Sequence, residues 1–152
     1  MKEEPTAKVI KTDLVYPELS YKIIGILFEV YNTLGHGYQE IYYQRAVSSA
    51  LKKEKFNFKE QVSIPLKYLD KRIGNYFLDF LIEDKIVLEI KRGDRFSRKD
   101  IEQIYGYLRA KKLQLGLLVN FTNHGVKFKR ILNINSYIRK NSPACHLPAN
   151  VG

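Results

Sequence analysis

The chain has 152 residues, enough for one domain with a modest core that needs no disulfide or metal to fold. Its formal net charge of +10 favours binding to polyanions such as nucleic acid, although an ordinary basic surface explains the charge equally well. One cysteine excludes an intramolecular disulfide, and three scattered histidines argue against a zinc site. Any bound metal is therefore expected to have oxygen ligands, as Mg²⁺ or Mn²⁺ does.

Membrane and export signals are not expected in this chain. No apolar run approaches the ~20 residues of a membrane helix, and the first residues, Met1 to Pro5, do not resemble a signal peptide. The lone Cys145 fits a reducing compartment. These features predict a cytoplasmic protein that does not associate with a membrane.

The chain begins with a charged segment that contains two prolines. Residues 1–18 are expected to form a flexible arm, 19–140 a single domain, and 141–152 a C-terminal tail. Apolar residues at helical spacing predict a first helix over 20–34. A Gly-His-Gly turn then ends this helix, and a second helix is predicted over 38–55.

Strand patterns follow the two helices. Alternation predicts a strand over 62–68, and Pro65 within it indicates a free edge because proline cannot donate to a ladder. Two apolar runs, 76–82 and 86–91, predict a hairpin. The later elements are a helix over 97–112 with Ser97 as its N-cap, a buried strand over 113–119 and a further element over 126–132. This order predicts an α/β sandwich around a mixed central sheet.

Hydrophobic patterning sets the register of the predicted hairpin. One of its faces is wholly apolar, as a sheet buried against helices requires. A slip by one residue would place Glu89 on that face. The predicted cross-strand pairs are therefore Ile82 with Ile86, Phe80 with Leu88, and Leu78 with Ile90.

The opposite face carries charge where folding gains nothing from it. Asp79 is expected directly opposite Glu89, at a Cβ separation of roughly 5 Å, where like charges destabilise a sheet. A divalent ion would cancel this repulsion, and the carbonyl of Ile90 could add an oxygen ligand. Lys91, on the same face, could orient a water and stabilise charge on an attacked phosphate. The alternative is a solvated face that bears ordinary surface charges.

Glu40 is another charge in an unusual position. At about 100° per residue, it falls beside the apolar stripe of the second predicted helix, between Val47 and Leu51. A carboxylate turned toward the core needs a partner or a cation. Alternatively, a glutamate in the first turn complements the helix dipole without any catalytic role.

These motif residues resemble the PD-(D/E)XK nuclease superfamily. Asp79 matches the acid that ends the first motif strand, and Glu89-Ile90-Lys91 matches the (D/E)-X-K element. Residues 37–43 read G-x-x-E-x-x-Y, and the chain over about 19–121 looks like the small GxxExxY family placed in that superfamily. One departure is Leu78, which stands where the superfamily's name has proline.

The resemblance implies a restriction-endonuclease-like α/β sandwich that hydrolyses phosphodiester bonds, with DNA as the expected substrate and Mg²⁺ or Mn²⁺ as the cofactor. It also implies that Glu40 joins Asp79 and Glu89 in binding the metal. Gln103 and Tyr107 match a Gln-x-x-x-Tyr pattern of the exonuclease branch, in which these residues support the active site and contact the substrate.

Other residues near these motifs have two interpretations. Gln103 and Tyr107 are expected to project together from the third predicted helix, away from its apolar stripe, and the alternative to a role is simple solvent exposure. The tyrosines around Glu40 either stack on bases or pack at the rim of the core; they are Tyr38, Tyr42 and Tyr43. The basic residues after the hairpin either hold phosphates or are solvated; they are Arg92, Arg95, Arg98 and Lys99.

The sequence therefore favours a metal-dependent nuclease, and two other classes stay open. One is a non-catalytic nucleic-acid-binding or adaptor module that retains the fold and its acidic residues. The other is a structural protein that forms a homodimer through an exposed strand edge. Retention of the aspartate, the glutamate and the lysine together favours the enzyme.

Overall fold

The structure is a computed structural model that describes residues 15–134. Most of the predicted arm lies outside the described residues, as do the end of the predicted domain, the whole predicted tail and Cys145. The division of the chain into arm, domain and tail therefore stays a prediction. In the described part of the chain, no helix is both long and apolar enough to cross a membrane.

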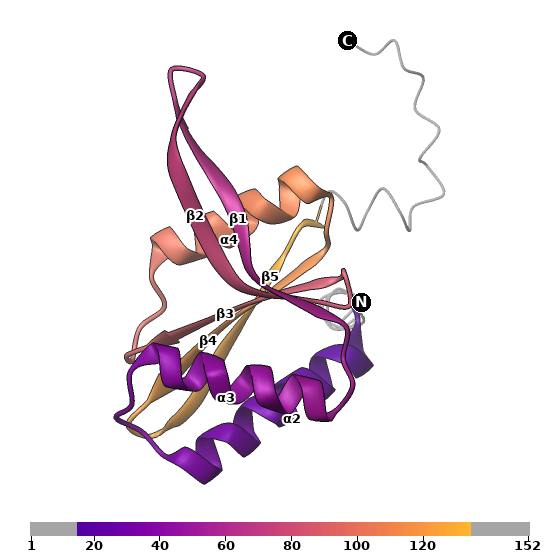
Figure 1. The fold of residues 1–152 in the computed structure, drawn as a ribbon, viewed down its shortest axis with the longest axis vertical. Helices are drawn as coiled ribbons and strands as arrows, with labels where there is room; N and C mark the ends of the chain where they lie inside the picture. Colours follow the sequence, from indigo (N-terminus) through magenta and orange to yellow (C-terminus); the bar gives the residue numbers. More distant parts are fainter. Residues whose placement is uncertain (1–14, 135–152) are drawn as a thin grey trace, which may run out of the picture.

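A mixed five-stranded sheet forms the centre of the molecule (Figure 1). The strands lie in chain order, and every neighbouring pair is antiparallel except β3 and β4, which are parallel and joined through a helix. The strands are β1 (Phe58–Tyr68), β2 (Lys71–Ile82), β3 (Ile86–Arg92), β4 (Leu115–Thr122) and β5 (Gly125–Leu132).

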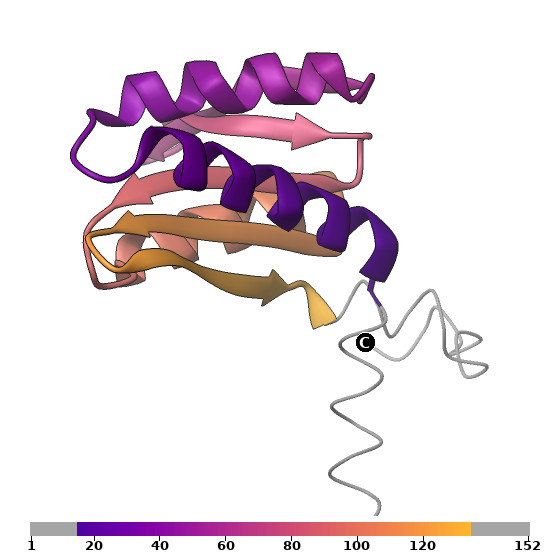
Figure 2. The ribbon, with the colours of Figure 1, turned by 90° about the horizontal axis from the view of Figure 1, so that it is seen from below.

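Helices cover both faces of this sheet. α2 (Pro17–Leu34) and α3 (Glu40–Lys53) lie side by side on one face, and α4 (Arg98–Lys111) lies on the other, as Figure 2 shows. The predicted α/β sandwich is therefore confirmed. The element predicted near residue 126 is a full strand, β5, which pairs with β4 at the edge of the sheet.

The helix boundaries differ slightly from those predicted. α2 begins at Pro17, three residues early, because proline in the first turn has no N–H that needs a partner. α3 is shorter than predicted, since Gln39 is still extended and the helix stops at Lys53. The predicted N-cap of α4 is confirmed: the Ser97 hydroxyl accepts a hydrogen bond from the Asp100 N–H at 3.4 Å.

The hairpin register agrees with the prediction close to the turn. Phe80 pairs with Leu88 and Ile82 with Ile86, and these four side chains pack beneath α2 and α3. Leu78 is different, because it packs on the α4 side of the sheet, whereas Ile90 packs on the α2 side. The predicted pair of Leu78 with Ile90 is therefore wrong.

An interruption in the side-chain alternation of β2 explains this difference. Tyr76 and Leu78 face α4, whereas Phe80 and Ile82 face the other two helices. Residues two apart on a regular strand share one face, so the alternation must break at Asp79. The ladder between β2 and β3 also stops at Phe80, and the two strands part there like the arms of a fork.

Beyond this fork, β1 and β2 continue as a long hairpin that projects from the body of the protein (Figure 1). β2 begins at Lys71, five residues earlier than predicted, and pairs with β1 as far as Tyr68. Pro65 lies on β1, at the edge of the sheet, as predicted. The apolar runs of the sequence therefore did not predict this projecting part of the β1–β2 hairpin.

Candidate active site

Two carboxylates lie in the fork between β2 and β3, where they replace the missing strand ladder. Asp79 Oδ2 accepts a hydrogen bond from the Ile90 N–H at 2.7 Å. In return, Glu89 Oε1 accepts one from the Asp79 N–H at 3.2 Å. Each side chain thus satisfies a backbone N–H of the opposite strand, which joins the strands and holds the two carboxylates together.

Two further side chains orient the pair from opposite sides of the sheet. Gln44 of α3 donates from Nε2 to Asp79 Oδ1 at 2.9 Å. Tyr76 of β2 donates its hydroxyl to Glu89 Oε2 at 2.8 Å. Every carboxylate oxygen of the pair therefore has one donor. Because an ionised carboxylate has about four lone-pair sites, each oxygen keeps room for a cation.

Burial makes this pair electrostatically costly. Asp79 is 5% exposed and Glu89 is 2% exposed. Burial, the adjacent Asp79 charge and the hydrogen bond between the two carboxyl groups raise the pKa of Glu89 to about 8. The hydrogen bond from the Tyr76 hydroxyl acts in the opposite direction and lowers this pKa. Burial also raises the pKa of Asp79. In the absence of a cation, the pair therefore retains a proton near neutral pH.

Lys91 supplies the positive charge beside this pair. It follows Glu89 by two residues on the same strand and is half-buried. Burial alone would lower the pKa of Lys91, but the surrounding carboxylates, chiefly Glu89 and Glu40, raise it overall. Lys91 therefore stays protonated at neutral pH and places a positive charge beside the two carboxylates.

Glu40 approaches the pair from the start of α3. Its Oε1 accepts a hydrogen bond from the Arg92 N–H at 3.3 Å, and its charge contributes to the raised pKa of Asp79. It also lines a cavity of about 490 Å³, together with the turn at 36–37 and the loops that follow β3 and β4. Glu40 therefore lies near enough to influence Asp79 electrostatically, but the cavity that it lines includes neither Asp79 nor Glu89.

Comparison with known proteins identifies the fold of this site. A family model described as the PD-(D/E)XK nuclease superfamily matches residues 17–131. This range includes all of the helices and strands described above except the last residue of β5. The chain belongs to the PD-(D/E)XK nuclease superfamily. Asp79 and the Glu89–Lys91 segment lie within the matched residues, on the two strands that form the fork.

A solved structure titled "Crystal structure of SSO0001" is similar to this chain at 19% sequence identity. The similarity covers 74% of this chain and 70% of that chain, with a TM-score of 0.46. No curated protein matches the chain. Membership of the PD-(D/E)XK superfamily implies nuclease-type phosphodiesterase activity and nucleic-acid binding. Its nucleases generally use divalent metals.

The metal ligands that the resemblance implied are only partly assembled. Asp79 and Glu89 lie next to each other. Ile90 lies between Glu89 and Lys91 on β3. Over residues 15–134, however, no group of three His, Cys, Asp or Glu side chains is arranged to hold a metal ion. The role of Glu40 as a ligand therefore stays a prediction.

The Gln-x-x-x-Tyr pair on α4 lies differently from the prediction. Tyr107 is buried with Ile104 and Leu108, so it belongs to the apolar stripe and does not project away from it. Its ring packs in a cluster with sheet residues such as Leu81 and Val87, against which side chains of the projecting hairpin also pack. Gln103 is half-buried, and its Oε1 is buried without a hydrogen-bond partner among the described residues.

The tyrosines near Glu40 divide between the two interpretations. Tyr43 is fully buried, and its hydroxyl donates to the Gly35 carbonyl at 2.6 Å, so this ring is part of the core. Tyr38 and Tyr42 are exposed at the same end of α3. The four basic side chains predicted as phosphate contacts, from Arg92 to Lys99, are also exposed.

Sequence reasoning missed Gln44 and Tyr76. Gln44 lies one helical turn after Glu40, so the spacing that places Glu40 beside the core also places Gln44 there. No comparable signal exists for Tyr76. Strict alternation places it on the opposite face from Asp79, and only the break in β2 directs its hydroxyl to Glu89.

Proposed function

We propose that this protein is a divalent-metal-dependent nuclease that hydrolyses phosphodiester bonds of DNA. The observation that carries this proposal is the buried Asp79–Glu89 pair, held in the fork with a protonated lysine beside it. Packing gains nothing from two carboxylates that repel each other. A site that must bind a doubly charged cation requires them.

The donor set fits a hard cation such as Mg²⁺ or Mn²⁺. In this proposal Asp79, Glu89 and the Ile90 carbonyl hold the ion, and Glu40 completes the set directly or through water. The ion, when bound, supplies Lewis-acid polarisation of the phosphate and lowers the pKa of a bound water. Gln44 and Tyr76 fix the orientation of the two carboxylates, as outer partners of metal ligands do.

The remaining residues act on water and phosphate. The Lys91 ammonium, held in a negative field, orients the attacking water and stabilises the charge that develops on the phosphate. Gln103 is proposed to position the substrate or Lys91 through its unpaired Oε1 end. Tyr107 supports this arrangement from within the core. The exposed arginines after β3 are placed to contact phosphates that flank the scissile one.

The choice of DNA rests on charge and resemblance. The net charge of +10 supports binding to a polyanion. The motif residues of the chain also resemble those of the PD-(D/E)XK superfamily, and this resemblance led to DNA as the expected substrate. RNA substrates belong in the same assay, and preferential cleavage of RNA would replace this part of the proposal.

The test is a cleavage assay with labelled single-stranded, duplex and branched DNA in Mg²⁺, Mn²⁺ or chelator. Wild type is expected to cleave at least one substrate with metal only. Glu89→Gln and Lys91→Ala are each expected to lose activity by about 100-fold or more. The matched controls, Glu29→Gln and Lys53→Ala, change exposed residues of α2 and α3 and are expected to keep it.

Cleavage that survives both active-site substitutions would reveal a contaminating nuclease. Absence of cleavage on every substrate would favour the second candidate, a non-catalytic nucleic-acid-binding or adaptor module. One observation supports that candidate: among the described residues, no three acidic side chains form a ready metal-binding group.

A further inference from the structure

The outward face of the β1–β2 hairpin is exposed although it begins at the carboxylate pair. The inner face packs toward α4 through Val62, Ile64 and Tyr76. Phe77 lies between inner residues, so its ring points to the outer face, where it is 47% exposed. It stands only two residues from Asp79. A large ring exposed beside a buried charge pair is positioned to meet a ligand of that pair.

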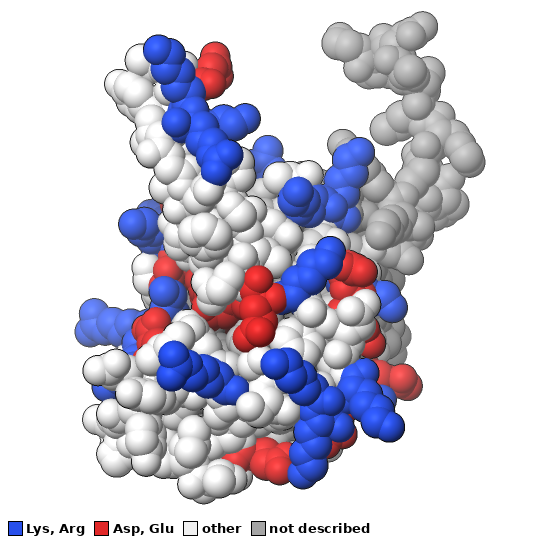
Figure 3. All heavy atoms as spheres, viewed as in Figure 1, with Lys and Arg blue, Asp and Glu red and all other residues white. Residues whose placement is uncertain are grey.

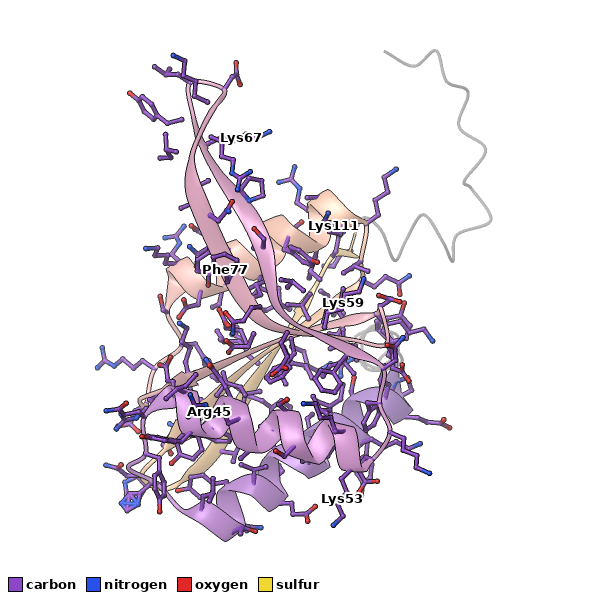
Figure 4. All side chains as sticks on the ribbon, viewed as in Figure 1. Arg45, Lys53, Lys59, Lys67, Phe77 and Lys111 are labelled. Atoms are coloured by element: carbon purple, nitrogen blue, oxygen red, sulfur yellow. The ribbon has the colours of Figure 1, made fainter. Side chains whose placement is uncertain are left out.

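Basic side chains continue this outer face toward the free end of the hairpin. Phe77 pairs with Ser63, and Lys67, four residues further along β1, pairs with Arg72 of β2. The pairing register shifts between Leu66 and Lys67, where β2 has one extra residue, Ile73. β1 itself has no extra residue between Ser63 and Lys67, so these two residues lie on the same side of the hairpin. Figure 4 shows Lys67 toward the free end and Phe77 nearer the base.

The positive charge on this arm is available to a ligand. Neither Lys67 nor Arg72 forms an ion pair with another residue of the described part of the chain. Figure 3 shows Lys and Arg side chains gathered on the hairpin, with acidic atoms beside them near its tip. Three more apolar side chains lie exposed at the same end: Tyr68, Leu69 and Ile73.

We infer that the outer face of the hairpin binds an unpaired nucleic-acid strand that leads into the fork. Phe77 stacks on a base next to the carboxylate pair, and Lys67 and Arg72 contact phosphates further along. This inference rests on the proposed function, because the nuclease site supplies the reason for a strand to enter the fork. An aromatic ring with flanking cations is the combination that binds single strands without sequence preference.

The dimensions of the arm agree with such a strand. Four residues along β1, from the partner of Phe77 to Lys67, span roughly 13 Å at ~3.3 Å per residue. Stacked bases rise ~3.4 Å per nucleotide, so about four nucleotides cover this distance. In a duplex the faces of the bases are already stacked on one another. An exposed ring therefore favours an unpaired segment over a duplex.

The test measures binding without cleavage. Full-length protein in EDTA is titrated into a fluorescein-labelled 20-nucleotide oligothymidine and a matched duplex, and fluorescence anisotropy gives each Kd. Phe77→Ala is expected to weaken single-strand binding by about tenfold, the loss expected for one stacked base. Phe77→Tyr keeps a ring and is expected to stay within about twofold of wild type. Duplex binding is expected to change less.

The basic pair has a separate readout. Lys67→Ala with Arg72→Ala is expected to reduce the salt dependence of single-strand binding, lowering the slope of log K against log salt by about 1.4 for two lost phosphate contacts. The matched controls are Tyr21→Ala, an exposed ring on α2, and Lys53→Ala on α3. Both are expected to bind as wild type does.

Each outcome decides between ideas. Equal single-strand affinity of wild type and Phe77→Ala would overturn the inference and leave the nuclease proposal to its cleavage assay. If Phe77→Ala weakens binding but the wild type cleaves no substrate, the inference about the hairpin would be supported and the proposed nuclease activity would be contradicted. If light scattering shows a dimer that Phe77→Asp converts to a monomer, the face is instead an interface between two copies, and the inference is wrong.

Discussion

Replacing Glu89 with glutamine should remove most of the pH dependence of stability of the metal-free protein between pH 5 and 8. Glutamine has the shape of glutamate without its charge. Its carbonyl can still accept the Asp79 N–H, and its amide can donate to the Tyr76 hydroxyl in place of the present contact. The substitution therefore removes the repulsion and keeps the packing.

The sign follows from the raised pKa of Glu89. Burial and the Asp79 charge raise this pKa from 4.5 in the unfolded chain to about 8 in the folded protein. Between these values the folded state holds a proton that the unfolded state has released. The stabilising contribution is therefore complete below pH 4.5 and is lost as the pH rises through 8.

The size of the effect is limited by one proton. One bound proton changes the free energy of unfolding by about 1.4 kcal/mol per pH unit. From pH 5 to pH 7 the loss is therefore at most about 3 kcal/mol. For a chain of this length, about 1 kcal/mol lowers Tm by roughly 2–4 °C. The metal-free wild type should lose up to about 10 °C of Tm over this interval through Glu89 alone.

The assay is thermal unfolding by circular dichroism in EDTA at pH 5, 6, 7 and 8. Groups that do not interact with Glu89 contribute equally to wild type and variant, so the difference between the two curves reports on the coupled Asp79–Glu89 pair. Glu29→Gln, an exposed substitution on α2, should follow the wild-type curve. Parallel curves for wild type and Glu89→Gln would refute the argument that this carboxylate is protonated by its burial beside Asp79.

Three further outcomes are expected. Millimolar Mn²⁺ or Mg²⁺ should raise the Tm of wild type, since 100 times Kd of an ion bound only by the folded state adds about 2.7 kcal/mol; a calorimetric scan in which Glu89→Gln gains as much would contradict the metal site. Tyr76→Phe should lower cleavage by about tenfold. It should also move the acidic limb of the pH–rate profile to higher pH, because the Tyr76 hydroxyl lowers the pKa of Glu89 and its removal lets that pKa rise; an unmoved limb would count against this contact. Gly116→Val should destabilise the fold by about 1–3 kcal/mol in chemical denaturation, because a Cβ there meets the Ile104 side chain; a wild-type midpoint would show that α4 can shift.

Local pattern in the sequence was sufficient to predict the helices and strands, and the pairing of β2 with β3 close to their turn. The alternation of apolar side chains predicted the pairs of Phe80 with Leu88 and Ile82 with Ile86, because a one-residue slip would bury charge. Pro65 on the edge strand and Ser97 as N-cap were equally local, since each depends on the hydrogen bonds of its own backbone. The closeness of Asp79 and Glu89 was predicted from the same register, but the ladder stops at Phe80 and the two residues are joined instead by side-chain hydrogen bonds to backbone N–H groups.

Only the tertiary structure decided how the site is built. Alternation states which face a residue takes on a regular strand, but it does not state where two strands part. The fork at Asp79 exists because the hairpin packs onto α4 while β3 continues between both helical layers. That divergence exchanges ladder hydrogen bonds for carboxylate contacts and directs Tyr76 to Glu89. The burial of Tyr107 was also not predictable from local pattern, because its ring packs in a cluster with residues that are distant in sequence, such as Leu81 and Leu118.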